Sequence, residues 1–338
     1  MGALDIGIDL GTTKIIIYKA DAGEILREPA VVAINTRDNS LIAVGGEALR
    51  MLGRTPNYIK AEYPLNDGVV SSHMLTEVML KECIKRACNS FLVKHRVIIC
   101  VPSAITDVEK RAVVEAVVNS GGRKVYLIEE PIAAAIGAGI DITRPNGSLI
   151  VDIGGGTTDV AVTSLSGIVL SQSMRYAGNK LDEEIIKLMS VKYKLSIGKK
   201  MAEKIKKEIG TVYAPSSHRT AQVKGRNLLS AYPQQITVSQ QDVYEAIAPF
   251  GEMLVDLVKR VLDKTPPELT SDIFENGILL TGGGSLLEGV PELLEAETHV
   301  HTRRAEHPVE CVSIGTGEAF KYIDILQTGF SAEATYRY

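Results

Sequence analysis

The chain has 338 residues, which at roughly 150 residues per domain predicts about two domains and a cleft between them. With 45% hydrophobic and 23% charged residues it can build substantial cores, so the disordered and fibrous classes are excluded. The formal net charge of −4 disfavours nucleic acid as the main partner, and no apolar run approaches the roughly 18 residues of a membrane span.

A degenerate repeat divides the chain into two halves. IGIDLGTTKIIIYKA at 6–20 and LIVDIGGGTTDVAVTSL at 149–165 each have a β-branched run ending in Asp, a Gly-Thr turn and a second β-branched run. The pattern predicts a β-hairpin in each half, because glycine supplies the positive φ angles that tight hairpin turns require. Segments 28–36 and 167–176 follow the hairpins and predict a third strand in each half.

The other expected elements alternate between strands and helices. In chain order they are a buried strand at 97–102, a helix at 108–122, a strand at 124–131 with Pro131 in the first turn of the next helix, helices at 181–195 and 199–210, short strands and loops at 213–229, a helix at 240–265, and a strand, glycine turn and helix at 277–296. This order predicts an α/β protein with a mixed sheet in each domain.

The two Gly-Thr turns predict a phosphate site. In duplicated domains they would face each other across the cleft and present backbone N–H groups to an anion. The turn residues are Gly11, Thr12, Thr13 and Lys14 in the first half, and Gly154, Gly155, Gly156, Thr157 and Thr158 in the second. Asp9 and Asp152 end the two strands and would supply carboxylates to Mg²⁺, which commonly takes one or two of them together with nucleotide phosphates.

Two further segments are candidates for binding a nucleoside. The third glycine run, Gly282, Gly283, Gly284, Ser285 and Leu286, lets a flat ring approach the backbone, or is simply a tight connection between a strand and a helix. Glu203, Lys206 and Lys207 share one helical turn and could meet a ribose or a base; the alternative is a solvated charged face.

These motifs carry a family resemblance. DLGTT, DIGGGTTD and TGGG, with EEPIAAAIGAG between them, resemble the actin-like ATPase superfamily, and MLGRTP, PLNDGVV, CVPSAITDVEKRA and TPPELTSDIFENGILLTGGGSLLEGV are similar to the MreB/Mbl family of bacterial actin homologues. The resemblance implies two related α/β domains with mixed five-stranded sheets, each split into two subdomains around a nucleotide cleft. It places domain I at 1–145 plus 313–338, with a small subdomain at about 33–75, and domain II at 146–312, with a small subdomain at about 180–243.

The resemblance also implies a function. It places ATP and Mg²⁺ in the cleft, where Glu130 positions the attacking water and Thr157 is its hydroxyl partner. It also implies that Glu203, Lys206 and Lys207 contact the ribose and the adenine, and that the segment from Gly282 to Leu286 holds the adenosine. The alternative for Glu130 is a carboxylate that stabilises a helix N-terminus. Lys14 stands where the family usually reads DLGTANT, so its contact with phosphate is the weakest of these assignments.

The expected activity is slow ATP hydrolysis coupled to head-to-tail polymerisation. The resemblance implies paired antiparallel filaments, peripheral on the cytoplasmic face of a bacterial inner membrane, that direct cell-wall elongation and rod shape with proteins such as RodZ, MreC and MreD. The alternative is a sugar-kinase-like phosphotransferase of the same superfamily, for which the sequence offers no sugar site.

A short apolar segment is the candidate membrane contact. Phe91, Leu92 and Val93 occupy the position of a membrane-inserting loop in some MreB proteins, and flanking basic residues would suit anionic headgroups. The alternative is that the three side chains pack beneath the loop as a minor core.

The four cysteines include no Cys-x-x-Cys pair, which predicts buried free thiols in a reducing compartment.

Overall fold

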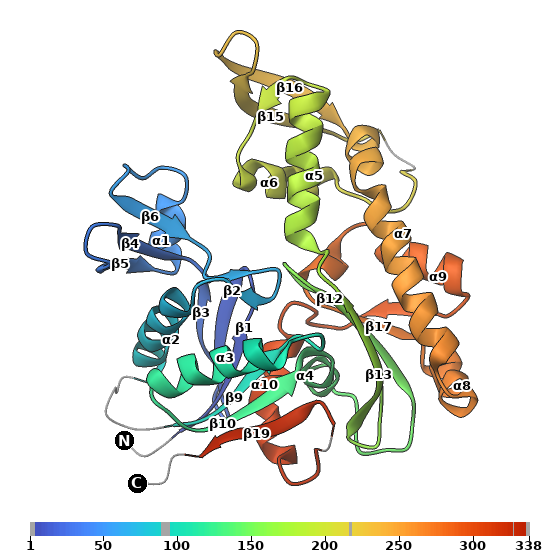
Figure 1. Cartoon of the computed structure of the whole chain (residues 1–338). Helices are drawn as coiled ribbons and strands as arrows, with labels where there is room; N and C mark the ends of the chain where they lie inside the picture. The colour runs from blue at the N-terminus through green and yellow to red at the C-terminus, as the bar shows by residue number, and fades with distance from the viewer. Residues whose placement is uncertain (1–3, 89–94, 216–217, 327, 336–338) are drawn as a thin grey trace.

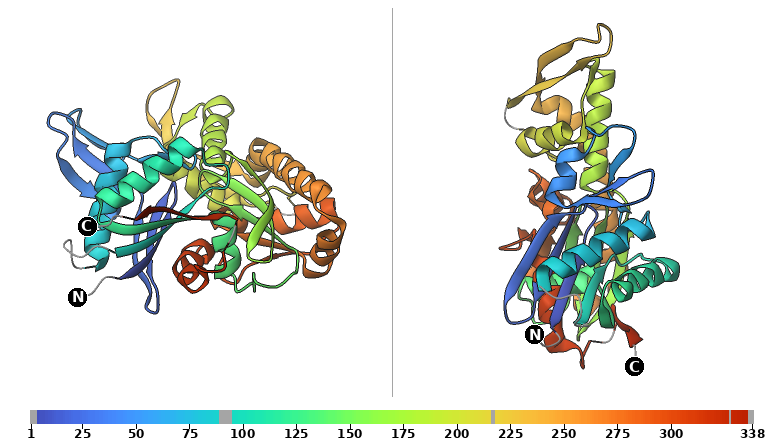
Figure 2. Two further views of the ribbon diagram at one scale, coloured as in Figure 1. Left: turned by 60° about the horizontal axis from the view of Figure 1, so that its bottom comes forward. Right: turned by 90° about the vertical axis from the view of Figure 1, so that its left-hand side faces the viewer.

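The computed structural model describes residues 4–88, 95–215, 218–326 and 328–335, and it has an α/β fold built on two large sheets (Figure 1). Each large sheet opens with one of the two repeated hairpins. The two sheets lie in opposite halves of the molecule, and two helices run between them (Figures 1 and 2). The predicted α/β class with a mixed sheet in each half is therefore confirmed.

The first sheet has the order β19-β10-β9-β1-β2-β3. Its strands are β1 (Asp5–Leu10), β2 (Lys14–Lys19), β3 (Gly23–Pro29), β9 (His95–Val101), β10 (Gly122–Glu129) and β19 (Phe330–Thr335). The first three strands form an antiparallel meander, while β1, β9 and β10 are parallel. The sheet has six strands where five were expected, because β19 from the C-terminal tail adds to β10 in an antiparallel direction.

The second sheet repeats this arrangement in the order β13-β12-β11-β17-β18. Its strands are β11 (Ser148–Ile153), β12 (Thr158–Ser164), β13 (Gly167–Met174), β17 (Ile278–Thr281) and β18 (Thr302–Arg304). An antiparallel meander again leads into parallel strands. The 143-residue spacing between Asp9 and Asp152 thus relates two equivalent hairpins.

The expected third strand at 28–36 is wrong in one respect. β3 ends at Pro29, and β4 (Val32–Asn35) turns into a different, smaller sheet. Proline has no N–H group to continue a strand ladder, so the chain leaves the large sheet there. The third strand of the meander is formed mainly by residues 23–27, and of the expected segment only Glu28 and Pro29 belong to it.

Helices fill the space between the sheets and cover their outer faces. α4 (Glu130–Gly137) and α10 (Cys311–Glu318) cross between the sheets, and a Cβ atom at Gly315 would lie 1.7 Å from the Ala133 carbonyl oxygen, so only glycine allows this approach. α2 (His73–Cys88) and α3 (Asp107–Asn119) cover one face of the first sheet (Figure 2). The long α7 (Gln240–Lys264), α8 (Pro267–Asn276) and α9 (Val290–Thr298) cover the second.

Each half also carries a small sheet, which Figure 1 shows at the left for the first half and at the top for the second. The first half has β4, β5 (Leu41–Val44), β6 (Ile59–Glu62) and α1 (Gly46–Met51); the second has β14 (Leu195–Ser196), β15 (Thr220–Asn227), β16 (Pro233–Ser239), α5 (Gly178–Val191) and α6 (Lys199–Ile209). They fall largely within the inserts expected at 33–75 and 180–243, whose boundaries remain predictions. The short elements β7 (Leu65–Asn66), β8 (Val69–Val70), η1 (Gly283–Leu286) and η2 (Ala319–Tyr322) complete the described fold.

The cysteines and the helices match what the sequence composition predicts for them. All four cysteines, Cys83, Cys88, Cys100 and Cys311, are buried free thiols. Within the described ranges, no helix combines the length and the apolar character needed to cross a bilayer.

Candidate nucleotide site

The two Gly-Thr turns touch each other across the middle of the molecule. A Cβ atom at Gly155 would lie 2.6 Å from Thr13 Cγ2, and one at Gly156 would lie 2.5 Å from Thr12 Oγ1. Glycine is therefore required at both positions for the turns to come this close. The structure thus brings together the two predicted phosphate turns from opposite halves of the chain.

A third turn, between β7 and β8, packs against both of them. The Gly68 N–H donates a 3.0 Å hydrogen bond to Thr12 Oγ1, and a Cβ atom at Gly68 would lie 2.7 Å from Thr157 Cγ2. The backbone of this turn is in the left-handed region at both Asp67 (φ 48°) and Gly68 (φ 78°). The Asp-Gly pair in PLNDGVV is a local turn signal, but its sequence does not reveal that it contacts the phosphate turns.

Buried carboxyl groups gather beside the turns. Burial raises the pKa of Asp9 to about 6, opposed by the nearby Lys14, and raises the pKa of Asp152 to about 6, opposed by a 2.6 Å hydrogen bond that Thr281 Oγ1 donates to it. The Asp152 charge also raises the pKa of Asp9, so the two carboxyl groups from opposite halves interact. Two such carboxylates close together favour a bound cation.

These carboxylates fit Mg²⁺ held partly by phosphates. In the part of the chain that the structure describes, no group of three His, Cys, Asp or Glu residues is arranged to hold a metal by itself. Mg²⁺ keeps several waters and is commonly bound through one or two carboxylates together with substrate phosphates. Asp9 and Asp152 match that donor set.

Asp159 is a site residue that the sequence interpretation missed. It is fully buried on β12, directly opposite Asp152 in the hairpin register, and burial raises its pKa to about 7. Glu130, the first residue of α4, lies near enough to Asp159 for the two carboxyl groups to interact. Burial first, and then the Asp159, Asp152 and Asp9 charges, raise the pKa of Glu130 well above its usual range. Asp159 is the last residue of the DIGGGTTD motif, and this was the sequence signal that could have identified it.

Lys14 supplies positive charge but bonds elsewhere. Its Nζ donates a 2.9 Å hydrogen bond to the Val309 carbonyl oxygen, in the segment before α10. Burial lowers the pKa of Lys14, and the neighbouring Asp9 opposes that shift. Lys14 therefore lies within electrostatic reach of the carboxylates, while its amine also ties the first turn to α10.

Lys206 joins the second turn to the helices above it. It forms a 2.8 Å ion pair with Asp182 and donates a 2.7 Å hydrogen bond to the Gly178 carbonyl oxygen. Gly178 and Asn179 in turn donate backbone hydrogen bonds to the carbonyl oxygens of the second phosphate turn. The start of α5 and the middle of α6 are thus fixed next to that turn.

The other predicted site residues do not all lie at the contact between the two phosphate turns. Glu203 and Lys207 form an exposed 2.6 Å ion pair one helical turn apart on α6. The third glycine run lies beside the second hairpin, where a Cβ atom at Gly284 would lie 2.2 Å from Ile153 Cγ2. The Thr158 hydroxyl donates to the Tyr176 carbonyl oxygen, so its hydrogen bond links β12 to the loop before α5. The predicted membrane residues Phe91, Leu92 and Val93 lie outside the described residues.

Comparison with known proteins agrees with this geometry. The model of the family described as MreB/Mbl protein matches residues 3–328. The chain belongs to the MreB/Mbl family. The chain is 46% identical over 327 residues to the cell shape-determining protein Mbl of Bacillus subtilis (strain 168), covering 96% of this chain and 98% of that protein. It is 45% identical over 327 residues to the cell shape-determining protein MreB of Escherichia coli (strain K12), covering 95% of this chain and 94% of that one.

Solved structures extend the likeness of this MreB/Mbl family member to its three-dimensional fold. MreB5 of Spiroplasma citri bound to AMPPNP superposes with a TM-score of 0.89 at 35% identity, covering 96% of this chain and 97% of that one. A chain of the MamK double helical filament superposes with a TM-score of 0.80 at 21% identity, covering 95% and 99%, and at this identity shows the shared fold alone.

Proposed function

We propose that this MreB/Mbl family member is a cytoskeletal protein that binds ATP with Mg²⁺, polymerises head to tail into membrane-associated filaments, hydrolyses ATP slowly and directs cell-wall elongation and rod shape. The observation that carries the proposal is the contact of the two glycine turns beside the buried carboxylates Asp9 and Asp152. MreB5, which is similar over nearly the whole chain, is described bound to AMPPNP and also to ADP.

The two turns would hold the phosphates. Backbone N–H groups at residues 11–14 and 154–158 would face the phosphate oxygens, and Asp9 and Asp152 would hold Mg²⁺. Bound there, the cation would neutralise charge on the phosphates during hydrolysis. The adenosine would lie between Glu203, Lys206 and Lys207 on one side and Gly282 to Leu286 on the other.

The buried pair of Glu130 and Asp159 would orient the attacking water. Hydrolysis of a phosphoanhydride requires mainly charge neutralisation and a positioned nucleophile. Glu130 would contact the water, with the Thr157 hydroxyl as its partner, while the neighbouring Asp159 carboxyl would help to fix the position of Glu130. Because burial raises the pKa of both carboxyl groups, the pair would be able to take up the proton that the water gives to Glu130.

Exposed apolar side chains support head-to-tail assembly. At the tip of the β15–β16 hairpin Leu229 is 83% exposed and Tyr232 is 74% exposed, and on α8 Phe274 is 68% exposed. The hairpin and α8 lie at opposite ends of the second half of the molecule (Figure 1). Two different surfaces at opposite ends make a heterologous contact that does not close, and such a contact produces open filaments.

The membrane and the wall machinery complete the proposal. Phe91, Leu92 and Val93 would contact the anionic inner face of the cell membrane, with the protein peripheral on the cytoplasmic side, and RodZ, MreC and MreD are the expected partners. The names of the curated relatives, which are cell shape-determining proteins, favour this reading over a sugar-kinase-like phosphotransferase.

Electron microscopy and pelleting of the purified protein with ATP and Mg²⁺ test the proposal. We expect filaments that form with nucleotide, together with slow phosphate release. Leu229→Ser with Tyr232→Ser should abolish pelleting and leave nucleotide binding intact, whereas Leu165→Ser, an equivalent change at another exposed apolar residue, should have no effect. Fast ATP turnover that requires an added sugar, without filaments, would reject it.

A further inference from the structure

An open cavity lies at the end of the first sheet away from the nucleotide site. It encloses about 580 Å³ and is lined by Leu4, Asp5, Lys19, Ala20, Asp21, Arg96, Arg123 and Lys124. Asp5 is the first residue of β1 and Leu10 the last, so the cavity and the phosphate turn that follows Leu10 occupy opposite ends of the same strand. Nothing in the proposed nucleotide chemistry uses these residues.

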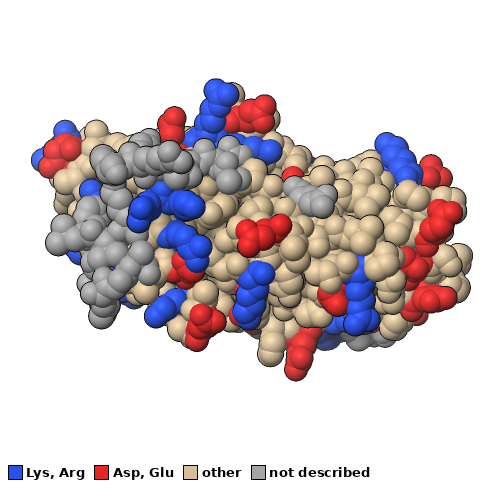
Figure 3. All heavy atoms as spheres, turned by 90° about the horizontal axis from the view of Figure 1, so that it is seen from below, with Lys and Arg blue, Asp and Glu red and all other residues tan. Residues whose placement is uncertain are grey.

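The cavity is basic in an acidic protein. Four basic and two acidic side chains line it, which gives a formal charge of +2, whereas the whole chain carries −4. The face seen from below shows Lys and Arg side chains gathered over part of the surface (Figure 3). A concave, locally positive site concentrates anions near it.

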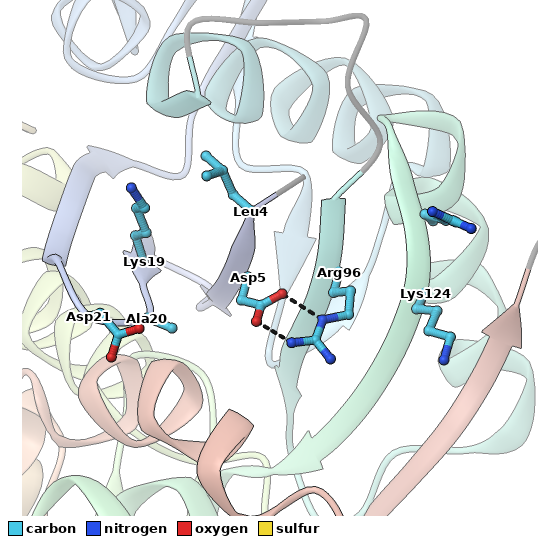
Figure 4. Close-up of a pocket in the computed structure, with 8 residues that line it drawn as sticks. Leu4, Asp5, Lys19, Ala20, Asp21, Arg96 and Lys124 are labelled. Carbon is cyan, nitrogen blue, oxygen red and sulfur yellow. Dashed lines mark hydrogen bonds and ion pairs between the residues drawn. The ribbon is translucent and has the colours of Figure 1, made fainter. Parts of the chain in front are cut away.

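One of the four basic residues is already paired and forms part of the wall. The Arg96 guanidinium makes two hydrogen bonds to the Asp5 carboxylate, one of them 2.6 Å long, and lies 5.5 Å from the centre of the Phe320 ring (Figure 4). This pair fixes the position of Arg96 between β1 and β9. Since Arg96 neutralises the Asp5 carboxylate, the net positive charge of the cavity comes from the other basic residues.

Those residues are available for a ligand. Lys19, Arg123 and Lys124 form no ion pair with any of the residues that the structure describes. In Figure 4, Lys19 lies on one side of the Asp5–Arg96 pair and Lys124 on the other. Lys19 lies on β2, and Arg123 and Lys124 lie on β10; β1 and β9, which carry the Asp5–Arg96 pair, lie between these two strands in the sheet.

We propose that this cavity binds a phosphate ester, with Lys19, Arg123 and Lys124 as its cationic contacts. Lysine binds phosphate as a point charge and arginine through its planar fork, and a cavity of this size accommodates the headgroup of a phospholipid or a small soluble phosphate. Both sources offer the same chemistry. In the sequence, β9 begins shortly after the predicted membrane residues. A lipid headgroup is therefore tested as a source together with a soluble phosphate ester.

The decisive variant is Lys19→Gln with Arg123→Gln and Lys124→Gln. Its control is Lys199→Gln with Lys224→Gln and Lys264→Gln, which removes the same charge from exposed residues in the other half of the chain. Both are prepared with AMPPNP and Mg²⁺, so that phosphate positions in the nucleotide site are filled. Unchanged AMPPNP binding in the cavity variant keeps its outcome separate from that of the proposed function.

Two probes distinguish the sources. Glycerol 3-phosphate is titrated by calorimetry, and vesicles of phosphatidylcholine with or without phosphatidylglycerol are tested by co-sedimentation. A basic residue near an anionic surface contributes about a fivefold change in affinity, so we expect an about hundredfold loss in the triple cavity variant. Loss of glycerol 3-phosphate binding identifies a soluble ester, and loss confined to phosphatidylglycerol vesicles identifies a lipid headgroup. Equal behaviour of the cavity variant and its control with both probes overturns the proposal.

Discussion

Gly156→Ala tests whether contact between the two halves is required for nucleotide binding. The new methyl group would lie 2.5 Å from Thr12 Oγ1, 2.7 Å from Asp67 Cα and 2.9 Å from Gly68 N. Two of these are backbone atoms of the opposite half, so the clash is relieved only if the halves move apart. Overpacking of this kind costs roughly 1–3 kcal/mol. If the closed arrangement is the one that binds, affinity for AMPPNP with Mg²⁺ should fall about 5- to 150-fold.

Calorimetric titration of AMPPNP measures this loss, and a second glycine provides the control. A Cβ atom at Gly198 would have no atom within 4 Å, so Gly198→Ala should bind nucleotide like the wild type. Because the clash lies between the halves, the thermal unfolding of nucleotide-free Gly156→Ala should change little. Wild-type affinity in Gly156→Ala would refute the reasoning, since the close contact would then play no part in binding.

Three further predictions concern the charged groups. Glu130→Gln should keep AMPPNP affinity and slow single-turnover phosphate release about a hundredfold; an unchanged rate would show that Glu130 does not orient the water. Since burial raises the pKa of Asp9 and Asp152 to about 6, binding of AMPPNP with Mg²⁺ should ionise both groups, release protons and strengthen between about pH 5 and pH 7. Calorimetry in buffers of different ionisation enthalpy measures the protons, and an affinity independent of pH contradicts it. Lys14→Met should weaken AMPPNP binding about tenfold, whereas a lower melting temperature with unchanged affinity would confine Lys14 to its bond with Val309.

The hairpins were predictable because their signals are local. Two β-branched runs around a glycine turn specify a hairpin wherever they occur, and their repetition indicates two related halves. The structure places the turns that contain Gly11 and Gly155 on equivalent hairpins and brings them into contact. The adenosine and hydrolysis roles depended on the family resemblance, and they stay predictions.

Other features depend on partners far away in the sequence. β19 forms because the segment that begins at Phe330 finds an open edge on β10, where Phe330 stacks 5.5 Å from Tyr126, about two hundred residues earlier. Asp159 resembles an ordinary strand residue until the fold places Glu130 against it. The β7–β8 turn likewise has a clear local pattern, but only the tertiary structure places Gly68 on Thr12.

The buried carboxyl groups explain how a ligand in the cleft would affect the whole molecule. Because burial raises the pKa of Asp9 and Asp152 above the unfolded value, the ligand-free protein loses stability as pH rises through about 6, where these groups must ionise with only Lys14 and the Thr281 hydroxyl to offset their burial. A bound cation with phosphates would remove that penalty only when both turns contact it together, since each half supplies one carboxylate and one turn. Ligand binding would therefore favour the arrangement in which the Gly156 backbone touches Thr12 and Asp67. Both exposed apolar surfaces proposed for assembly belong to the second half, so a change in how the halves meet would act on assembly only by moving the first half relative to a neighbouring subunit.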